Sequence, residues 1–390
     1  MTVQPSQRKC RCAVRCCDIT EKDLKYSPSK DTIAWLQSSS ELFFVYVKKR
    51  KTSKIRGHSD LPFTDILWSP DGKSLAVFSS LSVFIDIYSV NSEQACCAAS
   101  ISGAKNDQLG RPLAQFSPDG EYFATVNIST QGYAITIYNS GDSSWDCVQR
   151  MVCNDSRDVG GLLWCLDSAS LLVWQSGSSL QLRLWTADGT VERSLAADDA
   201  AVSCVCLSDC GRVAAVLTAD CKVRILDLLT WRLDMTEVLI HNPIIHKSSA
   251  RNRLKAPDDT SIQVSNCEKI TETLYELYND EAPGIYSALA QFSVDGQYLA
   301  TYVPSYPNTL WVWRLVDDTP LDTVIVLNED TSVKGIFWHK EEAILGANLN
   351  PGRILVWTPE KTVIINCKDS PWPLTAQEYL TSVKINEELS

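Results

Sequence analysis

The stretch Trp68-Ser69-Pro70-Asp71-Gly72 contains the residues of a tight turn, and it recurs along the chain. Proline presets one backbone φ angle, aspartate bonds to its own backbone, and glycine accepts a positive φ. Runs of alternating apolar residues flank the stretch, and two such runs around a turn predict a β-hairpin. Two further copies are clear and four are degenerate: Phe116-Ser117-Pro118-Asp119-Gly120, Phe292-Ser293-Val294-Asp295-Gly296, Tyr26-Ser27-Pro28, Trp164-Cys165-Leu166-Asp167, Leu207-Ser208-Asp209-Cys210-Gly211 and Trp338-His339-Lys340.

The spacing of these copies indicates a repeated structural unit. Their first residues lie at positions 26, 68, 116, 164, 207, 292 and 338, so neighbouring copies are 42–48 residues apart except for one gap of 85. A period of about 40–45 residues with four strands in each unit is typical of a WD-repeat propeller blade. The sequence therefore predicts an all-β fold, a seven-bladed WD40-like β-propeller with one long insertion between blades.

The repeat pattern divides the chain into blades and flanking segments. We expect residues near Cys10–Thr20 or the C-terminal tail to supply a strand that closes the propeller, because closure removes an exposed sheet edge. The expected segments are an N-terminal segment (1–22), blades 1–5 (23–233), the insertion (234–283), blades 6–7 (284–367) and the tail (368–390).

The composition limits the classes of function. A net charge of −11 over 390 residues argues against a dominant role in nucleic-acid binding. The 15 cysteines, without a secretion signal, predict buried, reduced thiols in a cytosolic or nuclear protein. No apolar run reaches the length of about 18 residues that a membrane-spanning helix needs.

The sequence contains no motif that predicts catalysis, a metal or a cofactor. It has four histidines and no HExxH, P-loop or GxSxG motif, and no GxGxxG follows a strand. The cysteines of the N-terminal segment lack a second CxxC or a histidine pair, so a strand or tail explains them better than a metal clip. The aspartates of the turns recur once in each unit, so we interpret them as turn formers. These residues are Asp71, Asp119, Asp167, Asp209 and Asp295.

Two segments depart from the blade pattern and are candidates for partner binding. The first is basic: Lys48, Lys49, Arg50 and Lys51 begin a run of six cations within nine residues, on a predicted loop between strands. Such a run suits an acidic partner such as a tubulin tail, a phosphoprotein or RNA. The alternative interpretation is a solvated hairpin tip.

The second candidate is the insertion, where apolar residues follow a helical period. Ile270, Leu274, Leu277 and Tyr278 lie at i, i+4, i+7 and i+8, which predicts a short amphipathic helix. Long insertions on scaffold proteins often carry function. We therefore expect Leu274, Tyr275, Leu277 and Tyr278 to contact a partner. The alternative is that this apolar face packs back on the edge of a blade.

Gly57-His58 resembles the Gly-His pair that opens a WD repeat, in which the histidine joins a buried hydrogen-bonded tetrad with Ser or Thr, Trp and Asp. The remaining tetrad residues are not visible in this unit. Where the family ends a strand in Trp-Asp, this chain keeps an aromatic or aliphatic residue and mostly lacks the aspartate, as in Ile87-Tyr88, Ile137-Tyr138 and Val356-Trp357. We therefore predict blades held by apolar packing more than by polar tetrads.

A narrower resemblance covers the chain from about Val205 onward. Lys222-Val223-Arg224-Ile225-Leu226-Asp227, followed by Thr230-Trp231-Arg232, resembles the end of one blade in the centrosomal and spindle-pole WD-repeat family, the WD-repeat protein eight or antisense-to-p-seventy-three type. In that family an insertion follows, and then a blade similar to Gln291–Thr301 with Pro307–Trp313 behind it. Leu355–Pro359 of the next unit also fits. The order of blade, insertion, blade and blade carries the resemblance.

The resemblance implies a non-catalytic scaffold at microtubule-organising centres, in the cytoplasm and cytoskeleton. In this family the protein pairs with a coiled-coil anchoring partner that tethers microtubule minus ends. In fungi it works with a minus-end-directed kinesin during spindle assembly. The family has more repeat units than the seven counted here. The alternative is an RNA- or ribosome-associated degenerate propeller adaptor, which the basic run favours and the acidic net charge opposes.

Overall fold

A computed structural model shows that the chain is built from β-strands and tight turns. Among the described residues it has no helix, and its strands form seven antiparallel four-stranded sets, one of which carries a fifth strand. These sets confirm the predicted all-β, seven-bladed class. The described residues are 24–29, 31–38, 41–56, 63–79, 84–91, 94–107, 112–129, 132–142, 144–153, 158–177, 180–197, 200–241, 252–255, 288–315, 321–327, 332–349, 353–360 and 362–366.

The chain divides into two compact units, Met1–Gly103 and Ala104–Ser390. Unit 1 holds two sheets, each made of four consecutive strands. The first contains β1 (Leu24–Tyr26), β2 (Thr32–Ser38), β3 (Glu41–Tyr46) and β4 (Lys51–Arg56). The second contains β5 (Phe63–Trp68), β6 (Ser74–Ser79), β7 (Phe84–Val90) and β8 (Ala95–Ser102).

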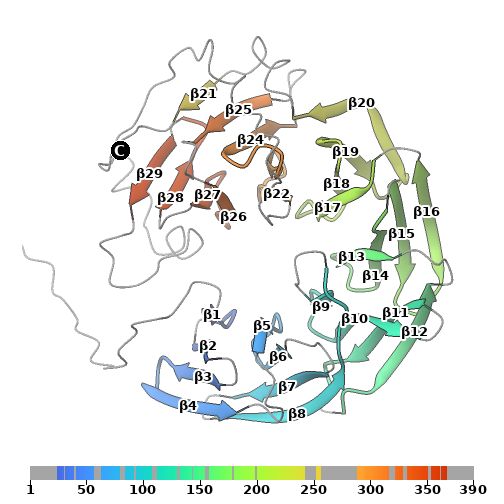
Figure 1. The fold of residues 1–390 in the computed structure, drawn as a ribbon, viewed down its shortest axis with the longest axis vertical. Helices are drawn as coiled ribbons and strands as arrows, with labels where there is room; N and C mark the ends of the chain where they lie inside the picture. Colours follow the sequence, from blue (N-terminus) through green and yellow to red (C-terminus); the bar gives the residue numbers. More distant parts are fainter. Residues whose placement is uncertain are drawn as a thin grey trace, which may run out of the picture. The chain divides into compact units, whose positions relative to one another are not determined.

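Unit 2 holds five sheets, again of consecutive strands (Figure 1). Their bounds are β9 (Ala114–Phe116), β10 (Tyr122–Ser129), β11 (Gly132–Asn139) and β12 (Cys147–Cys153); β13 (Val159–Trp164), β14 (Ser170–Gln175), β15 (Leu180–Thr186) and β16 (Val191–Ala197); β17 (Val202–Leu207), β18 (Val213–Thr218), β19 (Lys222–Asp227) and β20 (Arg232–Ile240); β22 (Leu289–Phe292), β23 (Tyr298–Tyr302), β24 (Thr309–Arg314) and β25 (Leu321–Val326); and β26 (Val333–Trp338), β27 (Leu345–Leu349), β28 (Arg353–Trp357) and β29 (Thr362–Asn366).

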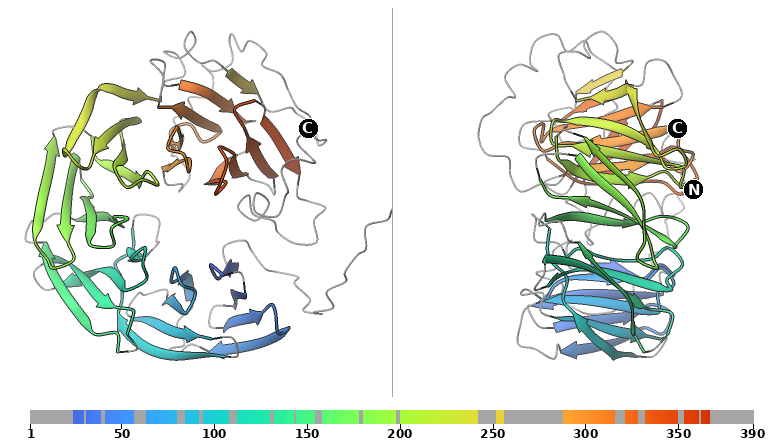
Figure 2. Two further views of the ribbon diagram at one scale, coloured as in Figure 1. Left: turned by 180° about the vertical axis from the view of Figure 1, so that it is seen from behind. Right: turned by 90° about the vertical axis from the view of Figure 1, so that its right-hand side faces the viewer.

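Within unit 2 each sheet twists from its first strand to its fourth. The first strands, such as β17 and β22, are seen nearly end-on in Figure 1, whereas β16 and β20 are seen lengthwise. The side view in Figure 2 shows strands of the same unit running across it. This is the ordinary twist of neighbouring strands. It leaves the fourth strand of each set at the outer margin of the unit.

The Ser-Pro-Asp-Gly stretch forms the turn between the first and second strands, as predicted. The Ser69 hydroxyl donates a hydrogen bond to Asp71 Oδ1 over 2.7 Å, and Ser69 Oγ accepts the Ser74 N–H at 2.9 Å. Gly72 has a φ of 72°, which favours glycine. Equivalent bonds recur in the two other clear copies of the stretch. One serine hydroxyl therefore ties the turn to the start of the second strand.

Two degenerate copies fill this turn with different residues. Between β17 and β18, Cys210 lies two residues beyond the serine, and its Sγ is 3.2 Å from Ser208 Oγ. The prediction that Asp209 forms this turn is therefore wrong, because the serine hydroxyl reaches the residue two positions on. Between β13 and β14, Ser168 takes the positive φ, at 56°. There Asp167 accepts two backbone N–H groups, as predicted for a turn former.

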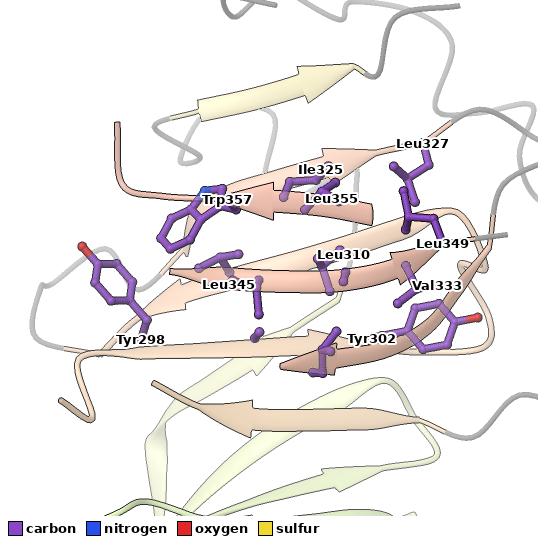
Figure 3. Packing of buried hydrophobic residues seen from close by; sticks show 14 residues of the cluster. Tyr298, Tyr302, Leu310, Ile325, Leu327, Val333, Leu345, Leu349, Leu355 and Trp357 are labelled. Atoms are coloured by element: carbon purple, nitrogen blue, oxygen red, sulfur yellow. The ribbon is translucent and has the colours of Figure 1, made fainter. Parts of the chain in front are cut away.

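The apolar core lies between neighbouring sheets. In Figure 3 the side chains of β22–β25 and β26–β29 meet in one cluster, with Tyr298, Leu310, Leu345 and Trp357 all buried. Similar clusters join each of the remaining pairs of consecutive sheets in unit 2, and another cluster joins the two sheets of unit 1. Burying one such side chain contributes about 1.5–3 kcal/mol. Each sheet is therefore stabilised mainly by its neighbours.

Three tryptophans at the ends of first strands add a polar link between sheets. In each case the indole N–H donates to a backbone carbonyl in the first strand of the preceding sheet. The pairs are Trp68 Nε1 with Lys25 O at 3.1 Å, Trp164 Nε1 with Gln115 O at 3.1 Å, and Trp338 Nε1 with Gln291 O at 2.9 Å. The recurrent tryptophan of the repeat thus sets how one sheet is positioned against the next.

Part of the predicted insertion is β structure. β20 continues to Ile240, past the boundary expected at residue 233, and β21 (Asn252–Lys255) pairs in parallel with β25 as a fifth strand (Figure 1). These four residues of the insertion therefore lie on a blade edge. The predicted helix around 270–278, the expected closing residues 10–20 and the tail 368–390 lie outside the described residues.

We predict that replacing Trp164 by Phe lowers the free energy of unfolding by about 1–3 kcal/mol. The phenyl ring keeps an aromatic contact with Tyr122, whose ring centroid lies 6.1 Å from that of Trp164, but the carbonyl of Gln115 loses its donor. Urea unfolding measures the change. Trp231→Phe is the matched control, because the Trp231 indole N–H has no partner in the described part of the chain. Equal losses in the two variants would contradict a role for the hydrogen bond.

Candidate partner-binding surface

The basic residues predicted on a loop lie on a hairpin of unit 1. Lys48, Lys49 and Arg50 form the turn between β3 and β4, whereas Lys51 is the first residue of β4. The loop is predicted to include Lys51, but in the structure Lys51 belongs to β4, which pairs with the whole of β3. Arg50 has a φ of 52°, at the position where the turn reverses the chain.

The turn side chains are exposed and include ion pairs with the same sheet. All four residues Lys48–Lys51 are exposed, and Lys48 Nζ lies 2.8 Å from Asp31 Oδ1 with 79% of its side chain accessible. Exposed pairs of this kind contribute at most about 1 kcal/mol. Residues 41–56 contain six cations and a single acid, Glu41. The hairpin therefore keeps a positive surplus at the surface.

One lysine of the hairpin is held against aromatic side chains. Ile55 packs on the core cluster of unit 1, so its neighbour Lys54 lies on the opposite face of β4. Lys54 Nζ is 5.4 Å from the centroid of the Phe43 ring, which stacks on Trp35 at 5.0 Å. Lys54 also pairs with Glu41 at 2.5 Å. This face of the hairpin is consequently ordered by cation–π and ionic contacts together.

The turn geometry is common to several sheets, while the run of cations is not. Trp145, Gly189 and Trp231 take positive φ values in the corresponding turns between third and fourth strands of unit 2. Their turns are acidic or apolar in the described residues, as at Asp188. Because the backbone does not demand lysine at this turn, the basic residues of the hairpin need another explanation, and partner binding is one.

The other predicted partner-binding residues, Leu274, Tyr275, Leu277 and Tyr278, lie outside the described residues. The structure does show where the insertion leaves the sheets. It begins after His241, which follows β20 and is 2% exposed. No motif in the sequence marks this histidine as functional.

His241 takes part in a directed chain of hydrogen bonds between two sheets. Its Nδ1 lies 2.8 Å from Cys221 O, an acceptor, so Nδ1 carries the proton and Nε2 accepts. Nε2 receives the Thr301 hydroxyl at 2.7 Å, and Thr301 Oγ1 accepts the Trp313 indole N–H at 2.6 Å. The sequence predicts blades held more by apolar packing than by polar tetrads, and this sheet nevertheless keeps the histidine, threonine and tryptophan of a tetrad.

The sequence hides this chain of bonds because the insertion separates its members. His241 and Thr301 are 60 residues apart, whereas an uninterrupted WD repeat brings its histidine within one unit of the threonine. No glycine precedes His241 to mark the start of a repeat. The usable signal is Trp313, whose indole N–H requires a buried acceptor on the neighbouring strand.

A second polar cluster lies in the turn between β18 and β19. Asp220 accepts the Thr218 hydroxyl at 2.5 Å and pairs with Lys222 at 2.9 Å, and Arg224, 3% exposed, donates to Thr218 Oγ1 at 2.6 Å. Burial raises the pKa of Asp220, but the hydrogen bonds from Thr218 and Lys222 and the charge of Arg224 outweigh it and lower the pKa to about 2. Cys221, the acceptor for His241, follows Asp220 in this turn.

The described residues contain no group of three or more His, Cys, Asp or Glu placed to hold a metal ion. The same part of the chain contains no helix that is long and apolar enough to cross a membrane. The prediction that the cysteines are buried fails at Cys96, Cys97, Cys147 and Cys210, which are exposed, and holds at Cys153 and Cys165.

The four-stranded sheets, their turns and their packing are those of the WD40 β-propeller fold. The crystal structure of the Myceliophteria thermophila Cps50 (Swd1) β-propeller domain matches with a TM-score of 0.50 and 14% identity, covering 88% of this chain and 95% of that one. The C-terminal WD40 domain of Sif2 matches with a TM-score of 0.56 and 12% identity, covering 88% of this chain and 80% of that one. These likenesses show the fold.

A curated relative agrees with the WD-repeat resemblance seen in the sequence. The mouse WD repeat-containing protein WRAP73 is 21% identical over 323 residues, which cover 76% of this chain and 67% of the relative. No family model matches the chain.

We predict that Thr301→Val lowers the free energy of unfolding by about 2–4 kcal/mol. The substitution keeps the side-chain shape but removes both the donor to His241 and the acceptor of Trp313, two buried polar groups. Urea unfolding of the single variants and of Thr301→Val/Trp313→Phe forms a double-mutant cycle. The hydrogen-bond chain predicts a double-variant loss smaller than the sum of the two single losses, and strict additivity would contradict it.

We predict that Asp220→Asn destabilises the protein by about 1–2 kcal/mol at neutral pH. The folded pKa, about 2, lies below the ordinary value of 3.8, so the unfolded chain binds this proton first as the pH falls. The difference between variant and parent should therefore be constant above about pH 5 and shrink between about pH 4 and 2. Urea unfolding across this range measures it. Asp209→Asn, at an exposed turn, is the control, and a pH-independent difference for Asp220→Asn would contradict the assignment.

Proposed function

We propose that the protein is a non-catalytic WD-repeat scaffold at the spindle pole or centrosome. It helps to anchor microtubule minus ends through a coiled-coil partner, and a minus-end-directed kinesin is a second partner. The observation that carries the proposal is the order of blade, insertion, blade and blade, with the motifs at 222–232, 291–301 and 307–313. The match with WRAP73 over 323 residues supports the same family.

The fold supports a scaffold mechanism. The sheets are held by apolar packing, by the turn hydrogen bonds and by the tryptophan links, so their turns and outer strands present fixed surfaces. In such interfaces a few buried aromatic or basic anchors carry most of the affinity. Leu274, Tyr275, Leu277 and Tyr278 of the insertion are the aromatic and apolar anchors we propose, and the hairpin Lys48–Lys51 supplies the basic ones.

The basic hairpin also favours a second candidate, an RNA- or ribosome-associated adaptor. Cations on an exposed turn suit a phosphate backbone, and such binding weakens steeply with salt. The net charge of −11 acts against it, because nucleic acid is repelled by the rest of the surface. We therefore favour a protein partner.

We predict that the fluorescently tagged full chain forms foci at the microtubule-organising centre in dividing cells. Imaging beside a marker of that centre checks it. The triple variant Leu274→Ala/Leu277→Ala/Tyr278→Ala should be recruited to the foci more weakly than the parent chain, because it lacks the apolar anchors. Its urea unfolding should be unchanged. Val148→Ala/Leu229→Ala, at exposed apolar positions of unit 2, is the matched control. A diffuse or ribosome-like distribution of the parent chain would reject the spindle-pole proposal. Recruitment of the triple variant to the foci at the level of the parent chain would reject the insertion as the binding segment.

A further inference from the structure

A fourth strand of this fold accepts an additional strand in the protein itself. β25 pairs on one side with β24 and on the other with β21, in parallel, from Asn252 opposite Thr323 to Lys255 opposite Val326. A strand with a neighbour on one side directs half of its N–H and C=O groups away from that neighbour, and these are the groups that a further strand bonds. The pairing of β21 shows that the twist of such a sheet leaves room for it.

β4 has the same open edge with a different set of side chains. It is the last strand of its sheet, with β3 as its neighbour among the described residues. Lys51, Thr52 and Lys54 are exposed along it, and Lys48–Arg50 continue the positive charge into the turn. The outer strand of the next sheet, β8, contains no charged residue. The fourth strands of unit 2 contain at most one cation each, such as Arg150 on β12, so the run of cations is particular to this edge.

The charge of this edge discriminates between two possible occupants. Lysines on an edge strand oppose pairing with a second copy of the same strand, because like charges face each other across the pair. The same lysines favour an extended segment with carboxylates at alternate positions, since opposite charges across a strand pair contribute about 0.2–1 kcal/mol each. The charge of β4 therefore disfavours pairing with β4 of a second copy and favours pairing with an acidic strand.

We propose that β4 is the docking edge for an acidic peptide segment of a partner protein, which adds to the sheet as a fifth strand. The peptide backbone bonds the outer N–H and C=O groups of β4, and its carboxylates, which share one face of the added strand, meet Lys54 and the turn lysines. The ion pairs Lys48–Asp31 and Lys54–Glu41 involve partly exposed groups, so exchanging them for the peptide's carboxylates costs little. This inference rests on the proposed scaffold function and gives the chemistry of one partner segment.

The test uses the full chain and a fluorescein-labelled eight-residue peptide of alternating valine and glutamate. Fluorescence anisotropy measures its Kd, along with that of the same peptide N-methylated at alternate residues. N-methylation removes backbone donors and leaves the charge unchanged, so it separates strand pairing from simple charge attraction. An eight-nucleotide oligouridylate of matched label tests whether the edge instead takes nucleic acid.

The variant Lys48→Gln/Lys49→Gln/Arg50→Asn/Lys51→Gln removes four charges, with asparagine at the positive-φ position because it tolerates that conformation. Arg232→Gln, an exposed cation on the outer strand β20, is the matched control, and urea unfolding verifies that both variants fold. We expect the quadruple variant to bind the peptide about tenfold more weakly, which corresponds to about 1.4 kcal/mol. The control should bind like the parent.

Each other outcome rejects the proposal. Equal binding of the N-methylated peptide would mean that charge acts without strand pairing, and tighter binding of the oligouridylate would assign the edge to nucleic acid. No binding of the peptide by the parent chain, or unchanged binding by the quadruple variant, would remove β4 as the docking edge. Failure here leaves localisation at the spindle pole to be judged by imaging, so the two proposals fail separately.

Discussion

The packing of each sheet's apolar face against the next sheet is the interaction on which the rest of this structure depends. An isolated four-stranded sheet of this kind exposes apolar side chains, and in both units a neighbouring sheet covers them. Within unit 2 the sheet β13–β16 is covered on both faces, through Leu171 on one and Leu172 on the other. A cluster of more than ten buried side chains contributes far more than a single hydrogen bond, whose net value is about 1 kcal/mol. The tryptophan links therefore add little to the total stability. Their effect is to position one first strand against the next, because an indole N–H must reach one particular carbonyl.

Because stability resides between sheets, the turns and outer strands tolerate changes that the core does not. One turn replaces aspartate by Cys210 and another replaces glycine by Ser168, yet both keep the hydrogen bonds that start the second strand. The hairpin of β3 and β4 carries a run of cations at a turn whose backbone is shared by other sheets. Partner-binding residues can vary at these positions without loss of the fold, which is how a repeated architecture acquires specific surfaces.

The insertion shows the same separation between the fold and its additions. It enters between His241 and β22, where the hydrogen-bond chain through Thr301 and Trp313 joins two sheets. The chain of bonds holds His241, the residue before the insertion, at a buried site. β21 then pairs with β25, at the outer edge of the sheet that contains Thr301 and Trp313. Within the described residues, the addition is in this way held next to His241 and along β21.

The sequence by itself determined the fold class, the seven repeats and most of the turns. These features depend on local chemistry, such as the serine, aspartate and glycine of Ser69–Gly72 and the alternation of apolar residues, which is readable along the chain. It also identified Lys48–Lys51 as unusual, but not that Lys51 begins an edge strand. Only the tertiary structure decided that His241 bonds Thr301, that Cys210 takes the place of an aspartate, and that β21 pairs with β25. Those contacts join residues whose separation the repeat period does not predict, and they form only when neighbouring sheets have packed and brought their strands together.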